Sequence, residues 1–168
     1  YIAFREKEQL IRTYREYYTD LSNPLVFQYL ENNAAKFRVD INSAHHLIRK
    51  YGALENDIPH HNEEVVESIL EHEKGYFDTI LKDIDTNIKL DNEQRRAVVT
   101  DDDYCLLVAG AGAGKTTTMA AKVKYLVDKQ GVLPEEIIVI SYTNKAINEL
   151  KERINKGLRI PARICTFH

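Results

Sequence analysis

Apolar residues in the first half of the chain recur at intervals of three and four, which is the spacing of one face of a helix. One such set begins near the start of the chain and comprises Leu10, Tyr14, Tyr17 and Leu21. A second helix is predicted to begin after Asn23-Pro24, because Asn is a favoured cap and Pro suits the first helical position. We therefore expect the chain to open with helices.

The same spacing continues after these two helices. A third helix is predicted from Ser43 to Tyr51, with Gly52 as its end, and residues 56–59 are predicted to form a loop. Residues 66–88 return to helical spacing. The pattern thus predicts an α-helical N-terminal region, residues 1–88, with little strand.

In the second half, short apolar runs alternate with helical patterns. The runs are residues 104–108, 137–141 and 162–166, and a helical face with Met119, Val123 and Leu126 follows the first of them. Apolar strands separated by helices are typical of parallel sheets with right-handed crossovers. We predict an α/β fold in which the three runs are adjacent parallel strands.

A loop of small residues joins the first run to its helix. It reads Ala109, Gly110, Ala111, Gly112, Ala113, Gly114, Lys115, Thr116 and Thr117. Small residues let backbone N–H groups approach phosphate oxygens, and the helix start adds a positive end. Strand, glycine-rich loop and helix together predict a nucleotide phosphate site. There Lys115 would reach the β- and γ-phosphates and Thr116 would hold Mg²⁺. The usual pattern has Gly where Ala109 stands.

Charge is divided unevenly between the two halves. Residues 1–88 carry ten Lys and Arg against sixteen Asp and Glu, whereas residues 89–168 carry thirteen against ten. We expect a polyanion to bind the second half. The acidic front half, with its stripe of tyrosines, is expected to contact protein and not DNA.

A further signal precedes the first apolar run. Asp91 is a predicted N-cap and Gln94 lies three residues later, as in a capping box. The Gln94 amide can also make a two-point hydrogen bond to adenine, so capping and nucleotide recognition both remain open. The aspartates at 101–103 are interpreted as a solvated turn.

Polar and aromatic residues follow the second and third apolar runs. They are Tyr142, Thr143, Asn144 and Lys145, and then Thr166, Phe167 and His168. The carboxyl ends of parallel strands are where ligands bind in such sheets, so Tyr142 is a candidate for base stacking and its neighbours for phosphate contacts. An ordinary helix start with Thr and Asn caps is the alternative.

The cysteines and histidines do not predict a further site. Cys105 and Cys165 lack metal spacing and are interpreted as small core residues of a reduced protein, and the paired histidines at 45–46 and 60–61 lack ligand spacing. The sequence has no signal peptide or long apolar run, which predicts a cytoplasmic location and no membrane partner. Because it lacks an initiating Met, we expect a piece of a longer protein.

In this order, the segments resemble the UvrD/Rep-like superfamily 1 DNA helicases, and most closely their helicase IV-like branch. Residues 90–95 match the Q motif, 109–116 motif I, 141–146 motif Ia and 166–168 motif Ib. The family commonly has Ala at the position of Ala109. Ser often stands where this chain has Ala113, and many close relatives have Arg in place of Thr117.

The resemblance implies an ATP-driven translocase that moves 3′ to 5′ on single-stranded DNA with ATP and Mg²⁺ as cofactors. Residues 89–168 would be the first part of RecA-like helicase domain 1A, a P-loop NTPase fold. Gln94 and residues 109–117 would bind ATP, and the residues after the strands would bind DNA. Because the match holds no carboxylate pair for Mg²⁺, the piece alone is expected to be inactive. Alternatives are an ATPase that remodels RNA polymerase and a regulatory P-loop module.

Overall fold

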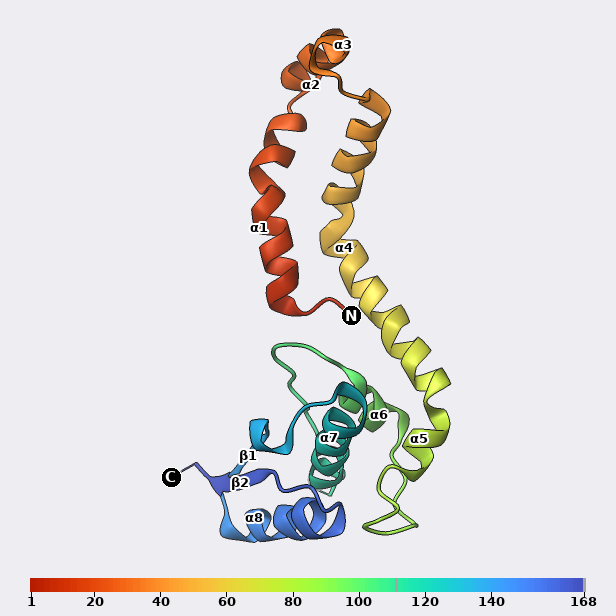
Figure 1. Ribbon diagram of the computed structural model, residues 1–168, viewed down its shortest axis with the longest axis vertical. Helices are drawn as coiled ribbons and strands as arrows, with labels where there is room; N and C mark the ends of the chain where they lie inside the picture. Colours follow the sequence, from red (N-terminus) through yellow and green to blue (C-terminus); the bar gives the residue numbers. More distant parts are fainter. Residues whose placement is uncertain (111, 168) are drawn as a thin grey trace. The chain divides into compact units, whose positions relative to one another are not determined.

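The computed structural model describes residues 1–110 and 112–167 of the chain, which form two compact units (Figure 1). Unit 1 comprises residues 1–65 and 101–104, and unit 2 comprises residues 66–100 and the chain from residue 105 onward. The protein is mostly helical with one small parallel sheet, which confirms the α/β class. Among the described residues, no helix has both the length and the apolar character that a membrane span requires.

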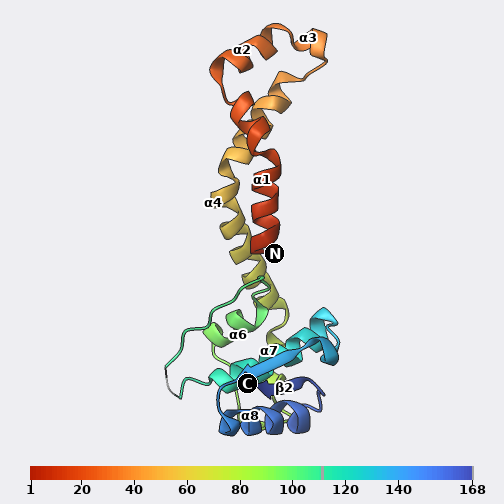
Figure 2. The same ribbon diagram turned by 90° about the vertical axis from the view of Figure 1, so that its left-hand side faces the viewer.

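Helices are the regular secondary structure of unit 1. Its elements are α1 (Phe4–Leu21), α2 (Pro24–Asn32), α3 (Ala34–Phe37) and the first part of α4 (Ile41–His72). Helices α1 and α4 lie side by side in both views, and α2 and α3 connect them (Figures 1 and 2). The Asn23 side chain accepts a hydrogen bond from the Leu25 N–H at 3.0 Å, and Pro24 is the first helical residue, so the predicted start of α2 is confirmed.

Helix α4 is longer than the sequence predicts. It runs for 32 residues through both Gly52 and Pro59, so the predicted end at Gly52 and the predicted loop at 56–59 are wrong. A Cβ at Gly52 would lie 2.9 Å from the Tyr18 hydroxyl, which shows that this glycine provides room for α1. Pro59 removes one helical hydrogen bond, but its neighbour Ile58 is only 4% exposed. Burial of Ile58 stabilises the helix where its local sequence is weak.

The acidic turn at 101–103 is not merely solvated, which corrects the sequence interpretation. Asp102 accepts a hydrogen bond from the Phe4 N–H at 2.9 Å, and Asp103 accepts one from the Arg5 N–H at 2.7 Å. The Arg5 guanidinium also donates to the Tyr104 hydroxyl at 2.7 Å. The turn therefore satisfies the first free N–H groups of α1, as a capping side chain would.

Unit 2 holds the sheet. After the end of α4 come α5 (Lys74–Thr79), α6 (Asn92–Val99), α7 (Lys115–Gln130) and the short 3₁₀ helix η1 (Pro134–Glu136). They are followed by β1 (Ile138–Ser141), α8 (Asn144–Leu150), the π-helical segment η2 (Lys151–Gly157) and β2 (Arg163–Thr166). Strands β1 and β2 pair in parallel, with Ile138 opposite Arg163 and Ser141 opposite Thr166. This confirms two of the three predicted strands and their adjacency.

The third predicted strand, residues 104–108, does not form. The segment has no regular secondary structure, and its Leu106 and Val108 side chains are 87% and 85% exposed. Cys105 is exposed as well, so its interpretation as a core residue is wrong. A buried parallel strand needs a hydrogen-bonded neighbour. Among the described residues, β1 pairs with β2 and no strand pairs with this segment, which accounts for the difference.

The core of unit 2 fixes the helix that follows the glycine-rich loop. Val98 in α6 and Ala120 and Ala121 in α7 are completely buried, and the two helices pack together. The Lys122 ammonium donates to the carbonyls of Val98 and Thr100 at 2.8 and 2.7 Å. Because free carbonyls at a helix end favour a cation, Lys122 ties α7 to the end of α6.

Candidate functional site

The loop between residues 109 and 114 adopts the backbone conformation that its glycines permit. Gly112 and Gly114 have φ angles of 80° and 76°, in the left-handed region that residues with side chains rarely adopt. Gly114 is also the N-cap of α7, so the loop leads directly into the helix start. Ala111 lies outside the described residues. The loop thus has the glycine-dependent turn and the helix N-terminus that an anion site needs.

Lys115 folds back across this loop. Its ammonium donates to the Ala109 carbonyl at 2.8 Å and to the Gly110 carbonyl at 2.6 Å, while the side chain stays exposed. A cation is therefore held at the loop by contacts that a phosphate oxygen could replace. Thr116 and Thr117 follow in the first turn of α7 and are half-buried.

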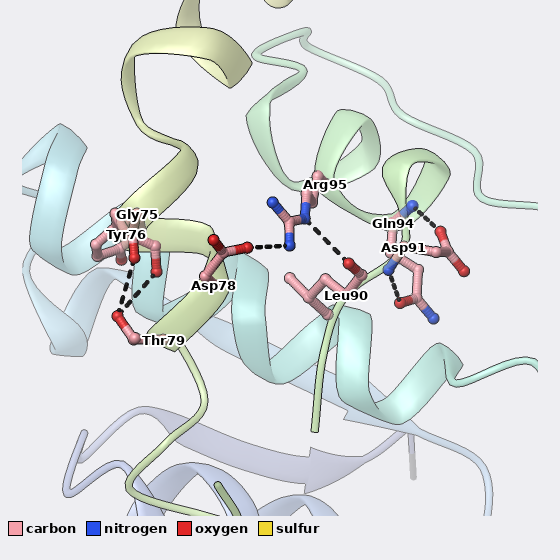
Figure 3. Close-up of polar contacts among 8 residues, drawn as sticks. All are labelled: Gly75, Tyr76, Asp78, Thr79, Leu90, Asp91, Gln94 and Arg95. Atoms are coloured by element: carbon pink, nitrogen blue, oxygen red, sulfur yellow. Dashed lines mark hydrogen bonds and ion pairs between the residues drawn. The ribbon is translucent and has the colours of Figure 1, made fainter. Parts of the chain in front are cut away.

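Gln94 connects the preceding helix to the loop. Its carbonyl oxygen accepts from the Asp91 N–H at 3.0 Å while Asp91 accepts from the Gln94 N–H at 2.8 Å, so the capping box is confirmed (Figure 3). The Gln94 amide also donates to the Ala113 carbonyl at 3.2 Å. An amide has two hydrogens and two lone pairs, so one donor and one acceptor remain for a nucleotide base.

Arg95, the next residue, connects the start of α6 to α5. Its guanidinium donates to the Leu90 carbonyl at 3.0 Å and to Asp78 of α5 at 2.6 Å (Figure 3). This hydrogen bond from Arg95 holds the pKa of the Asp78 carboxyl below its usual value. The sequence places Arg95 only within a motif, and no sequence signal links it to Asp78 seventeen residues earlier.

The residues after β1 and β2 form a second cluster. Because Ser141 is opposite Thr166, the next side chains meet, and the Tyr142 and Phe167 rings stack with centroids 6.3 Å apart and planes 25° apart. These rings are 84% and 70% exposed. An exposed aromatic pair offers apolar faces on which nucleic-acid bases can stack. His168 lies outside the described residues.

The polar residues beside this aromatic pair begin α8. Thr143 is the N-cap, and its hydroxyl accepts from the Ala146 N–H at 3.2 Å, as the capping alternative expects. A hydroxyl that accepts one hydrogen bond can still donate another. Asn144 and Lys145 are exposed in the first turn. The cluster therefore combines stacking surfaces, one hydroxyl donor and a positive charge at the helix start.

One contact in unit 2 involves a residue that sequence reasoning missed. Arg153 of η2 donates from its guanidinium to the Thr117 hydroxyl at 3.3 Å. The two residues are 36 positions apart. They do not belong to one motif, so no sequence pattern indicates the pair.

Known proteins resemble the same part of the chain. Residues 90–168 match the UvrD/REP helicase N-terminal domain. A probable DNA helicase II homolog from Mycoplasma capricolum is 40% identical over 83 residues, which cover 47% of this chain and 11% of that protein. The ATP-dependent DNA helicase PcrA from Staphylococcus aureus is 39% identical over 82 residues, 47% of this chain and 11% of that protein.

A third relative, a probable DNA helicase from Mycoplasma pneumoniae, is 40% identical over 85 residues, which cover 47% of this chain and 16% of that protein. The chain thus spans about a tenth to a sixth of the length of these relatives. The more specific resemblance to the helicase IV-like branch stays a prediction. The glycine-rich loop, the capped Gln94 and the paired strand ends all fall inside residues 90–168, the segment that is similar to the UvrD/REP helicase N-terminal domain.

Proposed function

We propose that this chain is part of an ATP-dependent DNA helicase that translocates 3′ to 5′ on single-stranded DNA. The main support for this proposal is the loop of residues 109–114. Its left-handed glycines, together with Lys115 and the start of α7, fit a nucleotide phosphate. The relatives named above are DNA helicases, and PcrA is an ATP-dependent one. The proposed fold of the complete domain is a RecA-like P-loop NTPase, with residues 89–168 as its first part and 1–88 as a helical addition.

At the nucleotide site, each residue has a separate role. Lys115 would exchange its two loop carbonyls for oxygens of the β- and γ-phosphates, and Thr116 would hold Mg²⁺ through its hydroxyl. Mg²⁺ would neutralise charge that develops on the phosphates. The backbone N–H groups of residues 110–117 complete the cradle. The 168 residues alone are proposed to bind nucleotide without turnover, because the matched motifs contain no carboxylate pair for the metal.

Gln94 reads the base in this proposal. Its remaining amide hydrogen and carbonyl lone pair suit N7 and N6 of adenine. Because the same amide holds the Ala113 carbonyl, adenine would bind to a group already fixed against the loop. This favours ATP over nucleotides whose bases present a different edge.

The DNA strand is proposed to cross the ends of β1 and β2. Tyr142 and Phe167 provide stacking surfaces, while Thr143, Asn144 and Lys145, together with Thr166 and His168, contact the backbone. Stacking on aromatic faces is tolerant of sequence, which suits a translocase.

We propose a different partner for the N-terminal region. Unit 1 has an apolar groove of about 360 Å³ between α1 and α4, and tyrosines line much of it. Residues 1–88 carry an excess of acidic groups, which disfavours DNA. This region is proposed to contact protein, for example RNA polymerase or repair factors. A crosslinking footprint of single-stranded DNA centred on residues 1–88 would contradict this assignment.

The test compares two substitutions in the complete protein by measuring ATP hydrolysis with and without single-stranded DNA. Lys115→Ala removes the charge aimed at the phosphates, so turnover should collapse with and without DNA. Tyr142→Ala removes one stacking contact worth about 1–3 kcal/mol, so more DNA should be needed for the same stimulation while basal turnover persists. Lys82→Ala, another exposed lysine in unit 2, is the control for Lys115. The assignment of the strand ends to DNA fails if Tyr142→Ala leaves the DNA dependence unchanged.

A further inference from the structure

One continuous helical segment joins the two candidate clusters of unit 2. Helix α8 begins after Thr143, beside the aromatic pair, and passes without a break into η2, which ends at Gly157. Its inward residues Ile147, Leu150 and Ile154 are 6%, 3% and 0% exposed. A helix buried along one side moves as a unit, because its side chains cannot shift independently in a close-packed core.

Arg153 lies at the far end of this segment and reaches the first turn of α7. Its guanidinium donates to the Thr117 hydroxyl at 3.3 Å and pairs with Glu149, one turn earlier, at 3.2 Å. The side chain is 28% exposed. Two fixed contacts on a planar guanidinium restrict its orientation, so Arg153 is positioned against Thr117 and not free in solvent.

The winding of η2 is unusual at this point. The segment is π-helical, a winding in which backbone N–H groups donate to carbonyls five residues earlier in the chain. π-Helical turns are rare, often occur at functional sites, and change the direction of the side chains that follow. Here the altered winding begins at Lys151, two residues before Arg153.

We propose that Arg153 is a positioning residue that couples DNA binding at the strand ends to the nucleotide site through Thr117. This inference rests on the proposed function. Thr117 lies next to Thr116, the proposed Mg²⁺ ligand, so a shift of Arg153 bears directly on the first turn of α7. When DNA binds Tyr142 and the start of α8, it shifts this end of the helical segment, and the buried helix transmits the shift to Arg153. If DNA binding changes the affinity for ATP by some factor, linkage requires that ATP binding change the affinity for DNA by the same factor.

The experiment measures basal and DNA-stimulated ATP hydrolysis by the complete protein. Arg153→Met removes the guanidinium but keeps an apolar stem, and Lys151→Met makes the same change at an exposed lysine of the same segment. We expect Arg153→Met to retain basal turnover and to lose about fivefold or more of the DNA stimulation, at the low end of measured couplings. Lys151→Met should keep the wild-type stimulation.

Four further measurements separate coupling from a structural defect. Arg153→Lys should recover only part of the stimulation, because a point charge cannot keep both fork contacts. Thr117→Val removes the acceptor, and adding it to Arg153→Met should lower the stimulation factor no further if the two residues act together. The ATP affinity ratio with and without a thymidine oligonucleotide should also fall in Arg153→Met, although linkage does not require it to fall by the same factor as the stimulation of turnover. Melting temperatures report whether a variant stays folded.

The outcomes distinguish this inference from the proposed function. If the wild-type protein shows no DNA-stimulated turnover, the proposed function fails and the coupling fails with it. If the wild type is stimulated and Arg153→Met matches Lys151→Met, only the coupling is overturned. Equal losses of basal and stimulated turnover in Arg153→Met would also overturn it, since they indicate damage to the site and not to its connection with DNA.

Discussion

Gly114 is predicted to be the least replaceable glycine of the loop, for a reason that Gly112 does not share. Both residues have left-handed φ angles, 76° and 80°, so adding a side chain at either costs about 1–2 kcal/mol. A Cβ at Gly114 would also lie 2.6 Å from the Gln94 amide nitrogen, whereas one at Gly112 would meet no atom within 4 Å.

The extra contact sets the size of the difference. To accommodate a methyl group at residue 114, the Gln94 amide must move away and give up its hydrogen bond to the Ala113 carbonyl. Such a bond contributes about 0.5–1.5 kcal/mol. We therefore expect Gly114→Ala to lower the free energy of unfolding by about 1.5–3.5 kcal/mol in total, and Gly112→Ala by about 1–2 kcal/mol.

Urea unfolding of the chain, followed by circular dichroism, measures both variants. The same two substitutions are then made in a Gln94→Ala background, where the clash and the hydrogen bond are both gone. There Gly114→Ala and Gly112→Ala should cost equal amounts, and the cycle isolates the contact with Gln94. The reasoning is refuted if Gly114→Ala costs no more than Gly112→Ala in the wild type, or if its excess cost persists without Gln94.

Two further predictions concern the helices. Gly52→Ala would ordinarily stabilise a helix interior by about 1 kcal/mol, but its Cβ would meet the Tyr18 hydroxyl at 2.9 Å; we expect no gain in melting temperature except in a Tyr18→Phe background, and a gain in the wild type would contradict this. Burial, followed by the charge of Asp128, raises the pKa of Tyr76, so the stability that its neutral form provides is complete below the unfolded pKa of about 10 and declines as pH rises above it. Urea unfolding between about pH 9 and pH 11 should show a smaller decline in Tyr76→Phe but not in Tyr142→Phe, and parallel curves would refute the assignment.

Features fixed by neighbouring residues could be predicted from the sequence. The Asp91–Gln94 capping box and the Asn23-Pro24 helix start both depend on groups within three positions of each other. The strands β1 and β2 were predictable because apolar runs separated by helices pair in parallel. The capping box and the helix start follow local rules that hold wherever the same residues occur.

Features that depend on distant contacts could not be predicted. Gly and Pro weaken a helix by about 1 and 3 kcal/mol, yet α4 continues through Gly52 and Pro59 because Tyr18 and the burial of Ile58 stabilise it from elsewhere. The segment 104–108 has the composition of a buried strand, but composition does not supply a pairing partner. Arg153 and Thr117 meet only because η2 packs against α7.

Gly114 combines the two kinds of information. The left-handed backbone alone would accept Asn or Asp, which adopt positive φ more readily than other residues with side chains. That argument applies equally to Gly112, where space for a side chain exists. At Gly114 a Cβ would displace the Gln94 amide, so only glycine allows both the turn and the contact with Gln94. The glycine before Lys115 is therefore required in part by the contact with a glutamine twenty positions earlier. The effect on stability of a substitution at either residue should depend on the identity of the other.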